Sequence, residues 1–176
     1  MSKKIGQKIH TLLGALLIAQ PTAYALSSAV VTLSGTIPAI QEVSLSTTNF
    51  SSPTSSFTVG SNQTYLLSFP SATLAYATNA AVPQIIQATL TTPPARGSVL
   101  VAVSGISNTG LLTGAKPGTA AAQPVTLSTA GSSATLINQI QWVNNSANIG
   151  FSFALDMTQP PGPLTSTVTV TMLASS

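Results

Sequence analysis

Ser166-Thr167-Val168-Thr169-Val170-Thr171-Met172-Leu173 is the stretch that decides the fold. Its apolar residues Val168, Val170 and Met172 occupy every second position, and threonines separate them. Successive side chains of an extended chain point to opposite faces, so this pattern predicts a half-buried β-strand. Valine and threonine also favour the pleated conformation because they are branched at Cβ. A chain made of such stretches is expected to be all-β.

The same alternation recurs along most of the chain after residue 25. In residues 29–37, one face of the expected strand carries Val31, Leu33, Gly35 and Ile37. Further strands are expected at residues 41–46, 56–59, 64–69, 73–77, 85–90, 98–104, 124–128, 134–143, 149–155 and 166–173. Turns rich in Gly and Pro separate these runs, and no helical apolar period holds beyond the N-terminal segment. Many short strands at this spacing predict a β-sandwich, with residues 105–123 as a surface loop.

The first 25 residues have the layout of a cleaved secretory signal peptide. Three lysines among the first ten residues precede a short apolar run at 12–19, and Ala23-Tyr24-Ala25 matches a cleavage site. The apolar run is shorter than the roughly 20 residues that span a bilayer. A helix of the folded domain is the other interpretation, and the cleavage motif argues against it. We therefore expect an exported protein whose mature chain starts at Leu26 and has no transmembrane segment.

Removal of residues 1–25 would leave very few ionisable groups. The charged side chains of the mature chain would be Glu42, Arg96, Lys116 and Asp156, with a net charge of zero and no histidine or cysteine. Most enzyme chemistry needs a titratable group, a thiolate or a metal ligand, so an enzyme is not expected. Two cations cannot form the basic patch that nucleic-acid binding requires. The composition likewise predicts no cofactor and no metal site.

The few residues that could carry chemistry have simpler interpretations. Glu42 and Asp156 are the only carboxylates, lie on different expected strands, and nothing in the sequence places them in one cleft. Lys116, the one lysine of the mature chain, lies in a Pro-Gly turn, so a Ser–Lys dyad in which it activates a serine is not expected. Trp142 is interpreted as a core or rim aromatic residue of a strand, because no neighbouring aromatic residue supports a sugar-stacking role.

The alternating segment at residues 29–37 permits two interpretations. It can pair within its own domain as an ordinary strand. It can also leave its domain and complete the sheet of a neighbouring copy, where main-chain hydrogen bonds supply affinity and alternate side chains fill pockets. Gly35 suits a place where such a groove narrows. Periodicity alone does not separate these two interpretations.

Two motifs resemble those of a known family. Val31-Thr32-Leu33-Ser34-Gly35-Thr36-Ile37-Pro38 resembles the N-terminal donor segment of chaperone–usher pilins, most closely the cysteine-free class that includes colonisation-factor and cable pilins. Thr158-Gln159-Pro160-Pro161-Gly162-Pro163-Leu164-Thr165, followed by the strand at 168–172, is similar to that class's approach to its final strand. The chain departs from type 1 pilins, whose disulfide and penultimate aromatic residue it lacks.

The resemblance implies an immunoglobulin-like β-sandwich over residues 40–176 that lacks one strand and is completed by a neighbour. Residues 26–39 would form the donor segment, which presents Val31, Leu33, Gly35 and Ile37. The strand with Val168, Val170 and Met172 would border the acceptor groove and contact a periplasmic chaperone.

The function implied is that of a structural subunit of a surface pilus, or fimbria, that supports adhesion. Its partners would be copies of itself, the chaperone, an outer-membrane usher and a host receptor or surface, and it would reach the cell surface through the periplasm. The alternative is a self-complete β-sandwich, secreted or on the surface, that acts as an adhesin or carbohydrate-binding module. An exported enzyme ranks last, because the ionisable groups are missing.

Overall fold

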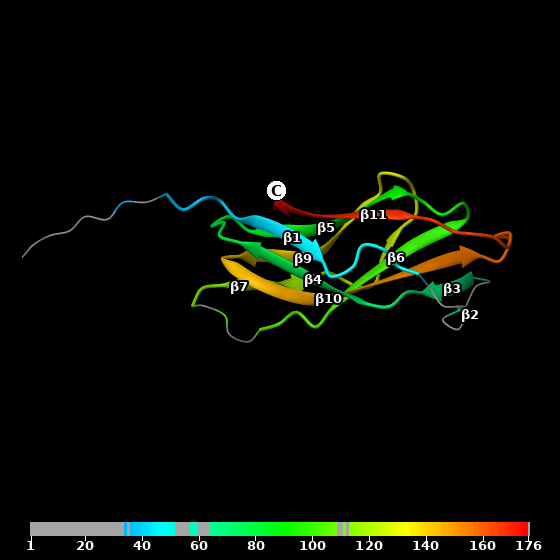
Figure 1. Ribbon diagram of the computed structural model, residues 1–176, viewed down its shortest axis with the longest axis horizontal. Helices are drawn as coiled ribbons and strands as arrows, with labels where there is room; N and C mark the ends of the chain where they lie inside the picture. Colours follow the sequence, from blue (N-terminus) through cyan, green and yellow to red (C-terminus); the bar gives the residue numbers. More distant parts are fainter. Residues whose placement is uncertain are drawn as a thin grey trace, which may run out of the picture. The chain divides into compact units, whose positions relative to one another are not determined.

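The computed structural model describes residues 34, 36–51, 57–59, 64–108, 111 and 113–175. Within these residues every regular element is a β-strand, so the predicted all-β fold is confirmed. The strands are β1 (Gln41–Leu45), β2 (Phe57–Val59), β3 (Thr64–Ser68), β4 (Ala72–Thr78), β5 (Gln84–Thr92), β6 (Gly97–Ser104), β7 (Lys116–Ala120), β8 (Val125–Leu127), β9 (Ser133–Gln141), β10 (Val143–Asp156) and β11 (Thr167–Ala174). Figure 1 shows their arrangement, and residues 38–176 form one compact unit.

The strands form a sandwich of two antiparallel sheets. The first sheet has seven strands, in the order β1-β4-β10-β3-β2, with β6 on β10 and β8 on β6. The second sheet has four strands, in the order β11-β5-β9-β7. The strands β1, β4, β10 and β6 have the order A-B-E-D of an immunoglobulin sandwich, and β11 and β5 correspond to its strands F and C. In the described residues no strand takes the place next to β11 that strand G has in that fold.

The long strand β10 organises the first sheet. It has 14 residues and pairs with β4 along its first half, from Val143↔Thr78 to Ile149↔Ala72. Along its second half it pairs with β3 and β6. One strand therefore joins both ends of the sheet.

The core lies between the sheets and follows the alternation of the strands. In β5, every second residue from Gln84 to Leu90 is buried, and β4 and β6 show the same pattern. The largest fully buried side chains are Tyr76, Leu74, Ile86, Leu90, Leu127, Leu136, Ile137, Ile140, Ile149 and Val101. Burial of an aliphatic side chain of this size stabilises the fold by about 1.5–3 kcal/mol, so this layer is the main source of stability.

The loop predicted at residues 105–123 is wrong in part, because β7 lies inside it. Lys116–Ala120 has no apolar alternation and becomes a strand only by pairing with β9. Gly118 has a φ of 92°, and its lack of a side chain allows β7 to lie close to β9. A Cβ atom at Gly118 would lie 2.5 Å from Ile137 Cγ2 and 2.8 Å from Asn138 O. Tertiary pairing therefore decides this strand, and local pattern does not.

The expected strand at 134–143 is also interrupted. The strand β9 ends at Gln141 in the second sheet, and β10 begins at Val143 in the first sheet. Trp142 between them has a φ of 45°, which turns the chain from one sheet to the other. The polar residues that follow lie within β10, although a break was expected before residue 149. Asn145 is accommodated there because its Nδ2 donates to Tyr76 Oη at 3.1 Å and to Ser107 O at 2.8 Å.

Hydrogen bonds tie the two sheets together on the side bounded by β7, β8 and the β9–β10 crossover, which we call the closed side. Gln123 Oε1 accepts from Val103 N in the first sheet at 3.2 Å, and its Nε2 donates to Leu136 O in the second at 3.3 Å. Tyr76 Oη in β4 donates to Pro117 O in β7 at 2.7 Å. Burial raises the pKa of Tyr76 to about 12 because the ionised phenolate would lose its hydration.

Candidate functional site

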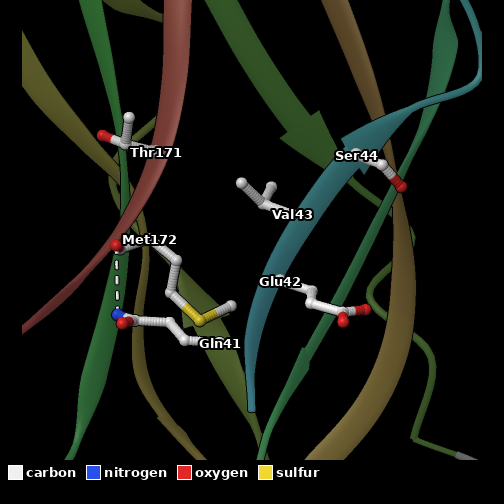
Figure 2. Close-up of a pocket in the computed structure, with 6 residues that line it drawn as sticks. All are labelled: Gln41, Glu42, Val43, Ser44, Thr171 and Met172. Carbon is white, nitrogen blue, oxygen red and sulfur yellow. Dashed lines mark hydrogen bonds between the residues drawn. The ribbon is translucent and has the colours of Figure 1, made fainter.

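On the opposite side of the sandwich, the residues that the structure describes leave two strand edges without a partner strand. The strands β1 and β11 each lie at the end of their sheet, and among the described residues no strand pairs with the outer edge of either. Both strands line one cavity, so the two free edges face each other (Figures 1 and 2). We call this the open side and the space between β1 and β11 the groove.

The floor of the groove is apolar. Directly opposite residues of an antiparallel pair lie on the same face of their sheet. Val168, Val170 and Met172 of β11 lie opposite the fully buried Leu90, Ala88 and Ile86 of β5. Val43 and Leu45 of β1 likewise lie opposite the buried Tyr76 and Leu74 of β4. Val168, Val170, Val43 and Leu45 face the core but remain only half-buried, so the groove leaves part of the core uncovered.

The backbone of β11 presents hydrogen-bonding groups to the groove. In an antiparallel pair, alternate residues direct their N–H and C=O groups toward the partner strand. Ser175 N donates to Pro83 O at 2.8 Å, so the odd-numbered residues of β11 face β5. Met172 O lies on the other edge, where it accepts from Gln41 Nε2 at 3.1 Å. The backbone groups that point into the groove are therefore those of Val168, Val170 and Met172.

The backbone of β1 has the matching arrangement. Ser46 N donates to Thr73 O at 2.9 Å, and Asn79 N donates to Ile40 O at 3.3 Å, so the even-numbered residues face β4. The groups that point into the groove are those of Gln41, Val43 and Leu45. On each edge, the same residues supply the core-facing side chains and the backbone groups that point into the groove, of which Met172 O accepts from Gln41 Nε2. An extended chain with alternating apolar residues would match both requirements.

One end of the groove is a cavity of about 520 Å³ between β1 and β11. Figure 2 shows Val43 pointing into this space, while Glu42 and Ser44 point to the other side of β1. Gln41 bridges the two strands, because its Nε2 donates to Met172 O and also to Gln84 Oε1 at 2.8 Å. Gln41 provides the side-chain hydrogen bonds that cross the groove at this end.

The other end of the groove is a cavity of about 500 Å³ lined by aromatic and aliphatic residues. Two ring contacts lie in its wall. Phe50 lies 5.0 Å from Phe151, and Phe69 lies 5.2 Å from Phe153, measured between ring centroids. Both pairs have the tilted or edge-on geometry that aromatic rings prefer. The remaining apolar lining residues are Leu45, Val99, Leu164 and Val168. This end suits a bulky apolar side chain.

The residues singled out from the sequence fall into two groups. Val168, Val170 and Met172 lie in β11 on the groove edge, and their contact with a chaperone stays a prediction. Val31, Leu33 and Gly35 lie outside the described residues, whereas Ile37 is described and 82% exposed. Sequence reasoning missed the rest of the lining. It had placed Val43, Leu45, Phe69, Phe151 and Phe153 in expected strands, but nothing in the sequence indicated that they line one site. Sequence reasoning assigned no site role to Gln41 or to the apolar lining residues Val43, Leu45, Phe50, Phe69, Val99, Phe151, Phe153 and Leu164.

The two carboxylates do not meet. Glu42 lies beside Ala77 of β4, and Ala77 lies beside Asn144 near the start of β10. Asp156 is the last residue of β10, so it lies at the other end of the sheet from Glu42. The strand between Asn144 and Asp156 spans on the order of 40 Å when extended.

Asp156 takes part in a small hydrogen-bonded cluster at the surface. Its Oδ1 accepts from Thr158 N at 2.7 Å, and Arg96 Nη1 donates to Thr158 Oγ1 at 2.7 Å. The hydrogen bonds from Thr158 lower the pKa of Asp156, and the charge of Arg96 lowers it further. This cluster fastens the turn after β10 to the start of β6.

Membrane spans and metal clusters are two other kinds of site. In the part of the chain that the structure describes, no helix is long and apolar enough to cross a membrane. No cluster of three or more His, Cys, Asp or Glu residues that could hold a metal ion occurs there either. Comparisons of the chain with models of protein families, with curated proteins and with solved structures found no match.

Proposed function

We propose that this protein is a structural subunit of a surface pilus, polymerised by donor-strand exchange. Residues 26–39 of one copy would occupy the groove between β1 and β11 of the next. The observation that carries the proposal is the pair of strand edges, unpaired among the described residues, that face each other over an apolar floor. A strand inserted there would pair its backbone with both edges and bury alternate side chains in the core.

The N-terminal segment has the composition that such a groove requires. Val31, Leu33 and Ile37 alternate with threonine and serine, so a strand of these residues would turn one apolar face to the floor and one polar face to solvent. Ile37, which the structure describes, leaves most of its side chain exposed. A large aliphatic side chain gains free energy by burial, and the groove of a neighbouring copy would provide it.

An open groove also explains the partners that the resemblance implies. Uncovered core residues beside two unpaired strand edges are an aggregation hazard. A subunit exported through the periplasm would need a chaperone that covers the groove, and an usher at the outer membrane would exchange the chaperone for the next subunit. The strand β11, with Val168, Val170 and Met172, would contact the chaperone. Adhesion to a host receptor or surface would follow from display of many copies.

A truncation separates donor-strand exchange from the self-complete alternative. We compare the mature chain 26–176 with a chain 39–176, both refolded in the presence or absence of a synthetic peptide of residues 26–38. The mature chain is expected to form filaments visible by electron microscopy. The truncated chain is expected to form none, and to bind the peptide with a gain in thermal stability.

The matched control is a peptide with Val31, Leu33 and Ile37 replaced by serine, which should not bind. Normal filament assembly by the truncated chain would refute the proposal. A mature chain that stays monomeric, refolds reversibly unaided and gains nothing from the peptide would instead support a self-complete adhesin or carbohydrate-binding module.

A further inference from the structure

A second apolar surface lies at one end of the sandwich, outside the groove. It consists of Ile40, Val82 and Trp142, which are 39%, 57% and 48% exposed. We call these three residues the end patch. None of them is charged, and the function proposed above does not use them.

Hydrogen bonds place the three residues of the end patch around the turn at residues 79–83. Ile40 N donates to Asn79 Oδ1 at 2.8 Å, and Ile40 O accepts from Asn79 N. Trp142 precedes the Val143↔Thr78 pair, so it lies beside the start of the same turn. Gln141, its neighbour, donates from Nε2 to Ala81 O, and Val82 follows directly. Figure 1 shows that β1 and β10 begin, and β4 ends, at this end of the sandwich.

The backbone conformation of Trp142 is a second sign that its exposed side chain has a role. A φ of 45° lies in the left-handed region, which is unfavourable for a bulky side chain and readily adopted by Gly or Asn. Such conformations cost about 1–3 kcal/mol and persist mainly where a site requires them. The crossover between sheets needs the left-handed turn, but it does not need a tryptophan. An exposed aromatic side chain at this position therefore points to a contact outside the domain.

The position of the N-terminal segment indicates which molecule contacts the end patch. Asn79 Nδ2 donates to Pro38 O at 2.7 Å, so the N-terminal segment leaves the domain beside the end patch. If Ile37 lies in the groove of a neighbour, Ile40 follows it by three residues, which span at most about 10 Å. The neighbour's surface must then lie within reach of the end patch.

We infer that the end patch is a second contact between copies, and that it packs against the copy that holds the same chain's N-terminal segment. The inference rests on the proposed function. Three side chains make an interface too small to hold two free domains together. It can act only because the inserted segment already tethers the copies and raises their effective concentration. The contact would set how successive subunits are angled and would speed elongation.

Trp142 is the only tryptophan of the chain, so its fluorescence reports on the end patch directly. We expect a blue shift of emission and protection from acrylamide quenching when the mature chain assembles into filaments. We expect neither change when the truncated chain 39–176 binds the peptide 26–38, because the peptide fills the groove and brings no second domain. Equal quenching in filaments and in the peptide complex would overturn the inference.

Substitutions at Trp142 provide an independent readout. Trp142→Ser is expected to slow filament elongation by about tenfold, which corresponds to about 1.4 kcal/mol. Trp142→Phe, which retains an apolar ring, is expected to elongate nearly as the wild type. Peptide binding by the truncated forms of both variants should be unchanged, which shows that the groove is intact. Normal elongation by Trp142→Ser contradicts the inference alone, whereas a wild-type truncated chain that never binds the peptide contradicts the proposed function.

Discussion

The closed side and the open side of the sandwich differ in how the two sheets are connected. On the closed side, Gln123 bonds to both sheets, Tyr76 reaches across to β7, and Trp142 carries the chain directly from one sheet into the other. On the open side, two strand edges face each other and Gln41 bridges them at one end. A fold that seals one side this thoroughly has the means to seal both. Donor-strand exchange, the function proposed above, would require this difference, and three experiments test the contrast between the two sides.

Filling the open side is expected to give the largest effect. We propose to append residues 26–38 to the C-terminus of the truncated chain 39–176 through a flexible linker, so that the chain can fill its own groove. Three buried aliphatic side chains contribute about 5 kcal/mol, part of which the ordering of the segment offsets. The free energy of unfolding, measured by urea denaturation, should rise by about 3 kcal/mol, and the protein should stay monomeric.

A matched control variant tests whether the added stability comes from the groove. Its appended segment carries serine in place of Val31, Leu33 and Ile37, and it should be no more stable than the truncated chain 39–176. If both appended segments stabilise equally, the open side is not a strand-binding groove.

Alkaline pH should weaken the closed side. The pKa of Tyr76 is about 12 in the folded protein and about 10 in the unfolded chain. A group whose pKa rises on folding contributes stability below its unfolded pKa, and that contribution disappears as the pH rises from about 10 to about 12. The loss should be on the order of 1–2 kcal/mol, because solvent screening reduces the full conversion of the shift. Urea denaturation across this range should show the loss in the wild type and a clearly smaller loss in Tyr76→Phe. Parallel curves for the two proteins would show that Tyr76 does not hold the closed side.

The two bridging glutamines provide the smallest and most direct comparison. Gln123→Ala leaves Val103 N without its partner in a half-buried site and removes one of the two hydrogen bonds to Leu136 O, which also accepts from Ala121 N, so it should cost about 1–2 kcal/mol. Gln41 is exposed, so Gln41→Ala should cost less than about 0.5 kcal/mol. Thermal and urea denaturation of both variants measure the difference. Equal losses of unfolding free energy in the two variants would mean that side-chain hydrogen bonds connect the sheets as strongly on the open side as on the closed side.

Alternation alone was enough to predict most strands. In β11, apolar residues at every second position correctly indicate which side chains face the core, whereas in β6 the run from Val99 to Val103 is apolar throughout and indicates the strand but not its buried face. The same reasoning missed β7, because pairing with β9 creates that strand and its residues carry no apolar pattern. It also extended the strand at 134–141 to residue 143, because nothing in the local sequence indicates that the backbone of Trp142 is left-handed.

The groove was beyond sequence reasoning for a related reason. Whether a strand edge is free depends on pairings between distant segments, such as β1 with β4 and β11 with β5. The aromatic cavity combines Phe50 with Phe151 and Phe153, which lie far away along the chain. The sequence could name one strand of the groove, β11, but not its partner or its floor.

The place of β1 has a mechanical consequence. This strand follows directly after the N-terminal segment, and it is held to β4 by a continuous register from Gln41↔Thr78 to Leu45↔Leu74. In a filament of the proposed kind, a pull along the axis would reach each domain through Pro38 and run along the length of β1. The hydrogen bonds between β1 and β4 would then bear the load side by side and break together, and would not unzip one after another. From β4 the force would pass to the 14-residue β10, which spreads it over the whole first sheet.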